Sequence, residues 1–243
     1  MSTGDKRVCL ITGAGGLLGN AFCQRYAGDY EIIAVCRSRA PGVPSQLERY
    51  VDPLAPDADL PENAASVYTI VGDLNSPHDV ERIVEVALAR FGKVDLLVNN
   101  AAYTARYHPT MVDDESALAN LEEHLRTNVV APFRLTMRLA QLFWRHRAEE
   151  NRAANRNVVN VSSTAGLHVY PHTGQGGYAT SKSALNTLTG HMAAEFDQFG
   201  VRANALLPNT FPDIVTTESV VEAIVRLDNE TATGAALVLD AAT

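Results

Sequence analysis

Apolar runs of strand length alternate along this chain with amphipathic segments of helix length, and this alternation constrains the fold more than any other feature. Such a pattern is typical of strand–helix–strand units that build a parallel sheet with helices on both faces. The strand runs are apolar throughout, as expected of strands that are buried on both sides. We therefore predict an α/β fold with a doubly wound parallel sheet of about seven strands. The expected strands are residues 7–12, 32–36, 67–71, 94–99, 157–162, 201–206 and 236–239, and the expected helices are residues 17–27, 77–91, 113–147, 178–199 and 218–227.

Local signals refine this outline at three places. Ser76 precedes the helix expected at 77–91, where its hydroxyl can accept a bond from a backbone N–H of the first turn. Pro132 lies inside the long helical stretch 113–147 and predicts a bend there. Prolines recur between residues 39 and 65, so we expect a surface excursion that holds at most a short helix near residues 45–50.

Composition limits the class of protein. At 243 residues the chain fits a single domain, 1–243, because doubly wound sheets often reach this length without a second core. No apolar run is long enough to span a membrane and no secretion signal can be drawn, so we expect a soluble, cytoplasmic protein. A net charge of −8 without a basic stripe argues against nucleic-acid binding. Cys9, Cys23 and Cys36 lack metal-ligand spacing, so we expect reduced thiols and no metal site.

The turn after the first expected strand is rich in glycine and opens directly into a helix. Glycines let the backbone approach a pyrophosphate closely, and the free N–H groups at a helix N-terminus favour its negative charge. Because this turn stands between a strand and a helix at the start of an alternating chain, it predicts a dinucleotide site. The residues expected to form it are Thr12, Gly13, Gly15, Gly16, Leu17, Leu18 and Gly19.

The end of the second expected strand favours one dinucleotide over the other. An acidic residue there would accept bonds from a free ribose hydroxyl, but this chain has Arg37, Ser38 and Arg39 instead. Guanidinium groups pair well with a 2′-phosphate, so we expect NADP(H) rather than NAD(H), bound in part by Arg37 and Ser38. Alternatively, the arginines are ordinary exposed loop residues. Asp73 and the backbone of Leu74 are expected to contact the adenine, although a turn-forming aspartate would also suit this position.

Three side chains downstream suggest proton chemistry. Tyr178 and Lys182 are four residues apart at the start of an expected helix, so their side chains lie on one face. A tyrosine normally titrates near 10, and a neighbouring cation favours its phenolate. Ser163 ends the strand just upstream and could hold a substrate oxygen. A tyrosine and a lysine at this spacing are common on helix surfaces. The catalytic interpretation of the pair therefore depends on the nearby Ser163.

Further motifs make the sequence resemble the short-chain dehydrogenase/reductase family, in its single-domain branch. They are Asn99-Asn100-Ala101-Ala102, Asn128 within Thr-Asn-Val-Val, and Val201-Arg202-Ala203-Asn204. The resemblance implies a Rossmann-like fold and hydride transfer between nicotinamide and a carbonyl or secondary alcohol. It implies that Tyr178 is general acid in reduction and general base in oxidation, and that Ser163 polarises the carbonyl. Lys182 would bind the nicotinamide ribose and lower the pKa of Tyr178, and Asn128 would anchor a water for proton relay.

The same resemblance implies further contacts and an assembly. The remaining expected cofactor contacts are Asn100, Ala101, Ala102, Asn128, Tyr178, Lys182, Pro208 and Phe211. Relatives pair two long helices, here at about 118–147 and 178–199, so a homodimer or homotetramer is expected.

The chain departs from the family pattern in three places. Leu17 stands where the single-domain branch usually has a glycine, and the loop 167–177, with His168, Tyr170 and His172, is about two residues longer than usual and is expected to shape the pocket. After Pro208 the segment that closes over substrate in relatives is short. We therefore expect an open site, for a small-molecule or carrier-bound carbonyl substrate, or one completed by another subunit. The alternatives are a non-catalytic NADP(H)-binding sensor or scaffold, and epimerase, dehydratase or dehalogenase chemistry on the same fold.

Overall fold

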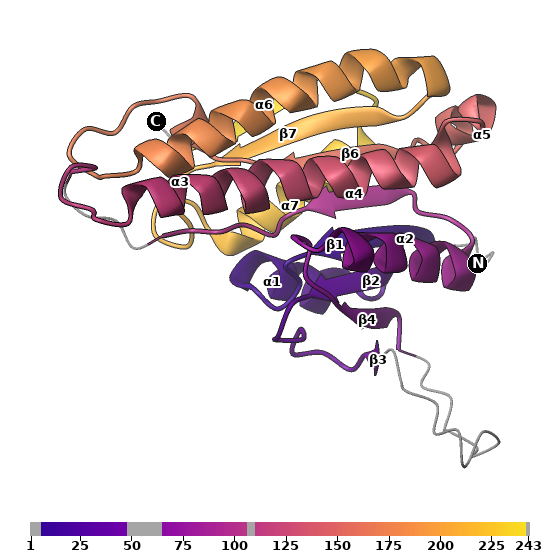
Figure 1. Cartoon of the computed structure of the whole chain (residues 1–243). Coiled ribbons are helices and arrows are strands. Elements are labelled where there is room, and N and C mark those ends of the chain that lie inside the picture. Colours follow the sequence, from indigo (N-terminus) through magenta and orange to yellow (C-terminus); the bar gives the residue numbers. More distant parts are fainter. Residues whose placement is uncertain (1–5, 48–64, 106–109, 242–243) are drawn as a thin grey trace.

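A parallel sheet forms the centre of the molecule, with strand order β3-β4-β2-β1-β5-β6-β7-β8 (Figure 1). The computed structural model describes residues 6–47, 65–105 and 110–241. The strands are β1 (Arg7–Thr12), β2 (Tyr30–Cys36), β3 (Gln46–Leu47), β4 (Val67–Val71), β5 (Leu96–Asn99), β6 (Asn157–Val161), β7 (Arg202–Pro208) and β8 (Ala236–Leu239). All of them pair in parallel, and apart from the two-residue β3 they are the seven strands that the sequence predicts.

The winding of the sheet reverses at β1. From β1 the chain moves outward to β2 and β4 and then returns to add β5 on the opposite side of β1. In open α/β sheets, the crevice at the carboxyl ends of the strands on either side of such a reversal is where ligands bind. The doubly wound, Rossmann-like architecture is thus confirmed, and it directs attention to the ends of β1 and β5.

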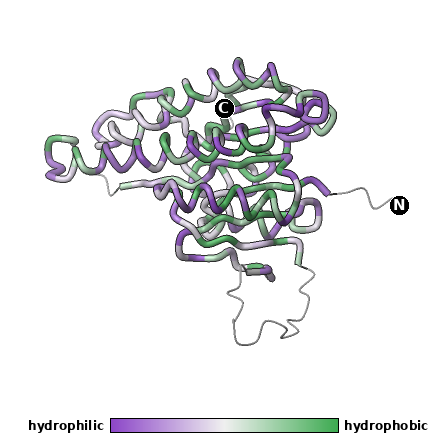
Figure 2. The backbone as a smooth tube through the Cα atoms, turned by 45° about the vertical axis from the view of Figure 1, so that its right-hand side comes forward, coloured by the Kyte–Doolittle hydropathy of each residue, from purple (hydrophilic) through white to green (hydrophobic). Residues whose placement is uncertain are grey.

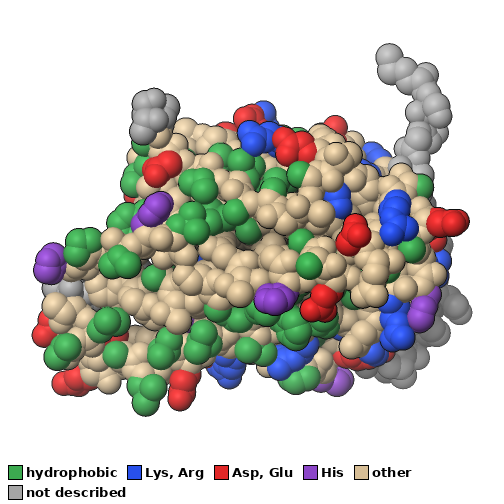
Figure 3. All heavy atoms as spheres, turned by 90° about the horizontal axis from the view of Figure 1, so that it is seen from above, with side chains coloured by type: hydrophobic (Ala, Val, Ile, Leu, Met, Phe, Trp, Pro, Cys, Tyr) green, Lys and Arg blue, Asp and Glu red, His purple; other side chains and the backbone are tan. Residues whose placement is uncertain are grey.

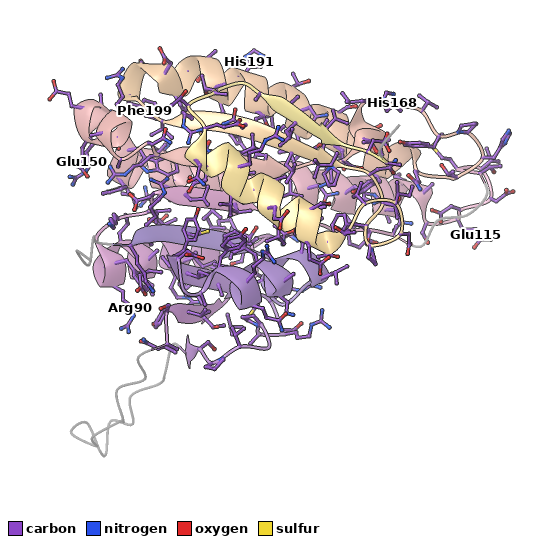
Figure 4. All side chains as sticks on the ribbon, turned by 180° about the vertical axis from the view of Figure 1, so that it is seen from behind. Arg90, Glu115, Glu150, His168, His191 and Phe199 are labelled. Atoms are coloured by element: carbon purple, nitrogen blue, oxygen red, sulfur yellow. The ribbon has the colours of Figure 1, made fainter. Side chains whose placement is uncertain are left out.

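Helices cover both faces of the sheet. They are α1 (Leu17–Tyr26), α2 (Pro77–Phe91), α3 (Ala117–Leu125), α4 (Ala131–Leu139), α5 (Ala148–Ala153), α6 (Gly176–Phe196) and α7 (Thr217–Asn229). One core lies between the sheet and α2, α4 and α6, which stand in front of the sheet in Figure 1. The second core lies under α1 and α7, which the view from behind in Figure 4 brings forward.

Alternate residues of one strand supply the two cores. In β1, Cys9 and Ile11 pack toward α1 and α7, whereas Val8 and Leu10 pack toward α2 and α4. This follows from the two-residue period of a strand that is covered on both sides. Figure 2 shows the resulting hydrophobic strands in the middle of the fold, with more hydrophilic stretches along the outer helices.

Local signals set the limits of several elements. The hydroxyl of Ser76 accepts a bond from the Asp79 N–H at 3.2 Å, and α2 ends at Gly92 in the left-handed conformation, φ 69°. The predicted bounds of α2 agree with the structure. Those of β1, β4 and β8 agree with it as well.

The long helical stretch predicted at 113–147 is divided by two wide turns of π-helix. These occupy Arg126–Val130 and Ala140–Trp144, on either side of α4. Pro132 is the second residue of α4 and cannot donate to the carbonyl four residues earlier, so the helix widens just before it. A wider turn thus precedes Pro132, and the bend expected there stays a prediction.

The sequence allowed at most a short helix near residues 45–50, and the described part of that range forms a strand instead. Gln46 and Leu47 form β3, which pairs with β4 at the edge of the sheet, and the rest of that prediction lies outside the described residues. An edge strand offers unpaired backbone groups, and pairing with them is more favourable than a short isolated helical turn. Among the described residues, no helix is both long enough and apolar enough to cross a membrane.

Candidate active site

The glycine turn after β1 is held tightly against its neighbours. Gly13 has a φ of +66°, and a Cβ there would lie 2.9 Å from the Cα of Ala101. A Cβ at Gly15 would lie 1.7 Å from the carbonyl oxygen of Arg39. Gly16 is the N-cap of α1, and no side chain caps this helix. The free N–H groups of the first turn of α1 are therefore open to an anion.

Thr12 and Asn100 tie the end of β1 to the end of β5. The Thr12 hydroxyl accepts bonds from the N–H groups of Asn100 and Ala101, each at 3.0 Å. The Asn100 side-chain amide donates to the Thr12 carbonyl at 2.8 Å. Thr12 thus supports the turn from beneath instead of lining a cleft.

Beside this turn lies a cleft of about 560 Å³, here called the glycine-turn cleft. It brings together most of the residues predicted to bind a cofactor: Gly13, Gly16, Leu17, Leu18, Arg37, Asp73, Leu74, Asn100, Ala101, Ala102 and Phe211. Leu17, which replaces the usual glycine, is 54% exposed and forms part of the wall. Thr12, Gly15, Gly19 and Ser38 do not line it.

The end of β2 presents arginine side chains and no carboxylate to this region. Arg37 lines the glycine-turn cleft, and Arg39 donates from Nε to the Gly15 carbonyl at 2.6 Å. Asp73 also lines the cleft, and its Oδ1 accepts the N–H of Asn75 at 2.9 Å. Asp73 therefore forms the turn that the alternative interpretation predicted, while its side chain still borders the cleft.

A second cleft, of about 540 Å³, contains three of the four side chains predicted to be catalytic and is here called the Tyr178 cleft. Ser163, Tyr178, Lys182 and Pro208 line it. The two clefts share Asn100, Ala102, Thr104 and Phe211, so they form one trough that leads from the glycine turn to Tyr178.

Ser163 and Tyr178 are hydrogen-bonded through their side chains, and Lys182 lies near the Tyr178 ring. The Lys182 ammonium is buried, donates to the Val161 carbonyl at 2.9 Å, and lies 5.6 Å from the centre of the Tyr178 ring. The predicted helix spacing therefore does place both side chains of the pair on the same side of α6.

The electrostatic expectation for this pair needs correction. Burial raises the pKa of Tyr178, and the hydrogen bond from Ser163 opposes that rise. Burial also lowers the pKa of Lys182 from 10.5 to about 8. The resemblance implied that Lys182 would lower the pKa of Tyr178, but here desolvation disfavours the charged form of each group.

Asn128 lies in the first π turn and is buried behind the trough. Its Oδ1 accepts the Tyr103 N–H at 2.7 Å, and its Nδ2 donates to the Tyr103 carbonyl and to Ser181 Oγ, each at 3.1 Å. Asn128 does not line either cleft. It joins the segment after β5 to α6, and the relay water implied by the resemblance stays a prediction.

The loops around Tyr178 complete the cleft. Tyr170 lines it and donates from its hydroxyl to Thr164 Oγ1 at 3.1 Å, in agreement with the expected role of the loop 167–177. His168 and His172 instead line an adjoining groove of about 620 Å³ beside Met111, which shares Tyr170 with the Tyr178 cleft. Figure 3 shows this end of the molecule from above, on the left, hollowed between protruding loops. Figure 4 labels His168 at the same end.

The short segment after β7 folds across the trough. Asn209, Thr210, Phe211 and Ile214 line the Tyr178 cleft, and Phe211 also lines the glycine-turn cleft. Sequence reasoning missed Thr104, Gln175 and the neighbouring His124, which no local motif marks. In the described part of the chain, His, Cys, Asp and Glu side chains nowhere gather in threes as a metal site requires.

Comparison with known proteins places this geometry in a family. The chain matches the family model described as short chain dehydrogenase over residues 7–222. It is 27% identical to levodione reductase from Leifsonia aquatica, over 92% of this chain and 75% of that protein. It is 30% identical to A-factor type gamma-butyrolactone 1'-reductase (1S-forming) from Streptomyces virginiae, over 84% and 71% respectively. The chain therefore belongs to the short-chain dehydrogenase family, a family of oxidoreductases.

Solved structures agree with this fold. The 3-ketoacyl-(acyl-carrier-protein) reductase from Brucella melitensis, complexed with NADH, superposes with a TM-score of 0.77 at 24% identity and 96% coverage of both chains. An oxidoreductase of the short chain dehydrogenase/reductase family from Brucella ovis, in complex with a partially ordered NAD, gives a TM-score of 0.68 at 28% identity, covering 97% of this chain.

Proposed function

We propose that this protein is an NADP(H)-dependent carbonyl reductase or alcohol dehydrogenase in which Tyr178 exchanges a proton with the substrate oxygen. The observation that carries the proposal is the continuous trough between the glycine turn and the hydrogen-bonded Ser163–Tyr178 pair. A trough that joins an anion-binding helix end to a proton donor suits a dinucleotide and a small oxygen-bearing substrate side by side.

The chain's own residues fit the coenzyme. The uncapped start of α1 suits the pyrophosphate, and the tight glycine turn leaves the backbone exposed to it. Arg37, without a carboxylate nearby at the end of β2, supports the 2′-phosphate of NADP(H). Asp73 and the backbone of Leu74 border the position proposed for the adenine. When bound, the nicotinamide supplies or accepts the hydride.

The proton chemistry follows from the environment of Tyr178. Because burial raises its pKa, Tyr178 is a neutral phenol at neutral pH and can donate to the oxygen that gains charge during reduction. Ser163 donates a second hydrogen bond to that oxygen and polarises the carbonyl. Lys182 lies below the ring and would bind the nicotinamide ribose, and in oxidation Tyr178 accepts the proton.

The surroundings of the trough suggest the type of substrate and the assembly. Thr104, Tyr170 and Ile214 border the Tyr178 cleft, which supports a small-molecule or carrier-bound carbonyl substrate. Exposed apolar side chains on the long helices, Val130, Phe133 and Leu142, support a homodimer or homotetramer. Cys9, Cys23 and Cys36 are buried free thiols, as a cytoplasmic location would require.

The test is coenzyme oxidation by purified protein, followed by the ultraviolet absorbance of the reduced nicotinamide with a panel of ketones, aldehydes and 3-oxoacyl thioesters. We expect NADPH oxidation with at least one carbonyl, and a loss of about 100-fold or more in Tyr178→Phe with little change in NADPH affinity. Tyr170→Phe, which keeps a ring in the same cleft, is the matched control. NADPH binding without oxidation across the panel would favour the alternative, a non-catalytic sensor or scaffold.

A further inference from the structure

A histidine that no motif marks lies directly behind Tyr178. His124, near the end of α3, is only 2% exposed. Its ring stands edge-on between two tyrosine rings, with centroids 5.0 Å from Tyr103 and 5.9 Å from Tyr178. The His124 ring therefore packs against the ring of the proposed proton donor.

The imidazole of His124 has unused hydrogen-bonding capacity. Neither Nδ1 nor Nε2 has a hydrogen-bond partner among the described residues. The ring lines a cavity of about 260 Å³ together with Asn120, Leu121, Gly177 and Thr180. Both ring nitrogens are buried from solvent, so a charge on the imidazole would have no hydrogen-bond partner among the described residues.

The first turn of α6 gives Tyr178 little local support. No side chain caps this helix, and Tyr178 follows Gly176 and Gly177, which are poor helix formers. A Cβ at Gly177 would lie 3.4 Å from His124 Nδ1, so the imidazole packs closely against the first turn of α6. The position of Tyr178 therefore depends on His124 of α3 and on Asn128 of the first π turn, which acts through Ser181.

The charges around His124 favour its neutral form. Burial lowers its pKa from 6.5, and the Lys182 ammonium on α6 adds to that effect. Glu123 on α3 and the Asn120 carbonyl, which forms no well-aligned hydrogen bond to the ring, act in the opposite direction. The rings of Tyr103 and Tyr178 each form a T-shaped pair with the imidazole. The Asp114 side chain borders the same cavity.

We propose that His124 is a positioning residue: its uncharged ring packs against Tyr178 and keeps the phenol in the trough. Protonation of the imidazole weakens this packing. A charged imidazole in this place adds a second cation near Lys182 and requires water that the ring stack does not admit. The ring then moves toward the cavity, and Tyr178 loses its support. This inference rests on the proposed function, because it concerns the same proton donor.

Three variants separate packing from charge. His124→Phe keeps an aromatic ring but cannot take up a proton, His124→Ala removes the ring, and His191→Gln changes an exposed histidine farther along α6 (Figure 4). We expect the wild type to lose kcat at a pH below the usual range of histidine, about 6.5, because burial lowers the pKa of His124. His124→Phe should abolish this decline, and His124→Ala should lower kcat about tenfold at neutral pH with unchanged NADPH affinity. His191→Gln should behave as the wild type.

Two results would overturn the proposal. One is a His124→Phe enzyme with the same acid decline as the wild type, or with a rate at low pH that falls below it. The other is a His124→Ala enzyme with wild-type kcat at neutral pH.

A measurement without turnover keeps this inference separate from the proposed function. In NMR spectra of the coenzyme-free protein, the imidazole signal that is absent in His124→Phe should titrate below 6.5, and the ring signals of Tyr178 should shift with it. Tyr178 ring signals whose chemical shifts stay constant through this titration would refute the positioning role. If instead they follow it while no carbonyl is reduced, the proposed function fails and the coupling stands.

Discussion

The buried ammonium of Lys182 should weaken the folded state at neutral pH. Its pKa falls from 10.5 to about 8 on folding, which corresponds to about 3 kcal/mol of differential stability. Because the folded pKa is the lower one, the charged side chain opposes folding fully below about pH 8. That opposition fades as the pH rises from about 8 to 10.5, where the side chain is neutral in both states.

Lys182→Met replaces the ammonium with an unbranched apolar group of similar length. The change also leaves the Val161 carbonyl without its donor, which costs about 1–2 kcal/mol. We therefore expect the variant to be more stable than the wild type by about 1–2 kcal/mol at pH 7, with the advantage lost by about pH 10. Turnover should fall below detection, since the variant has no group to bind the ribose.

Urea unfolding of the coenzyme-free protein, followed by circular dichroism at several pH values, measures this difference. Lys6→Met is the matched control, because the Lys6 ammonium is only partly buried and donates to Ser66 Oγ at 3.1 Å. A Lys182→Met protein that is less stable than the wild type at neutral pH would refute the reasoning. So would a stability difference that stays constant up to pH 10.

Three further substitutions test other parts of the molecule. Arg37→Ala should weaken NADPH binding about 10- to 100-fold, measured by fluorescence titration, and leave the affinity for NADH almost unchanged. Equal losses of affinity for the two coenzymes would remove the basis for the NADP(H) preference. Gly13→Ala should cost about 1–2 kcal/mol in urea unfolding because of its φ of +66°; an unaffected variant would show that the turn can relax. Asp228→Asn should cost about 2–3 kcal/mol by the same assay, because the buried Asp228 pairs with Arg7 at 2.8 Å; a smaller loss would mean that water replaces the carboxylate.

Elements whose signals are local could be predicted from the amino-acid order alone. The bounds of β1, β4, α2 and β8 followed from apolar runs, from Ser76 at the start of α2 and from the glycine turn after β1. The spacing of Tyr178 and Lys182 placed both on one side of α6, because helix periodicity needs no tertiary information. Membership of the short-chain dehydrogenase family could also be predicted from the sequence, because each of its motifs is a short contiguous segment.

Tertiary structure decided what depends on segments that are far apart in the chain. The pairing of β3 with β4, the contribution of Phe211 to both clefts and the position of His124 behind Tyr178 each join regions with no shared local signal. Burial likewise determined the pKa values of Tyr178 and Lys182. Spacing placed an ammonium near the phenol, but desolvation, which arises only when the whole fold excludes water, shifts both pKa values away from their charged forms.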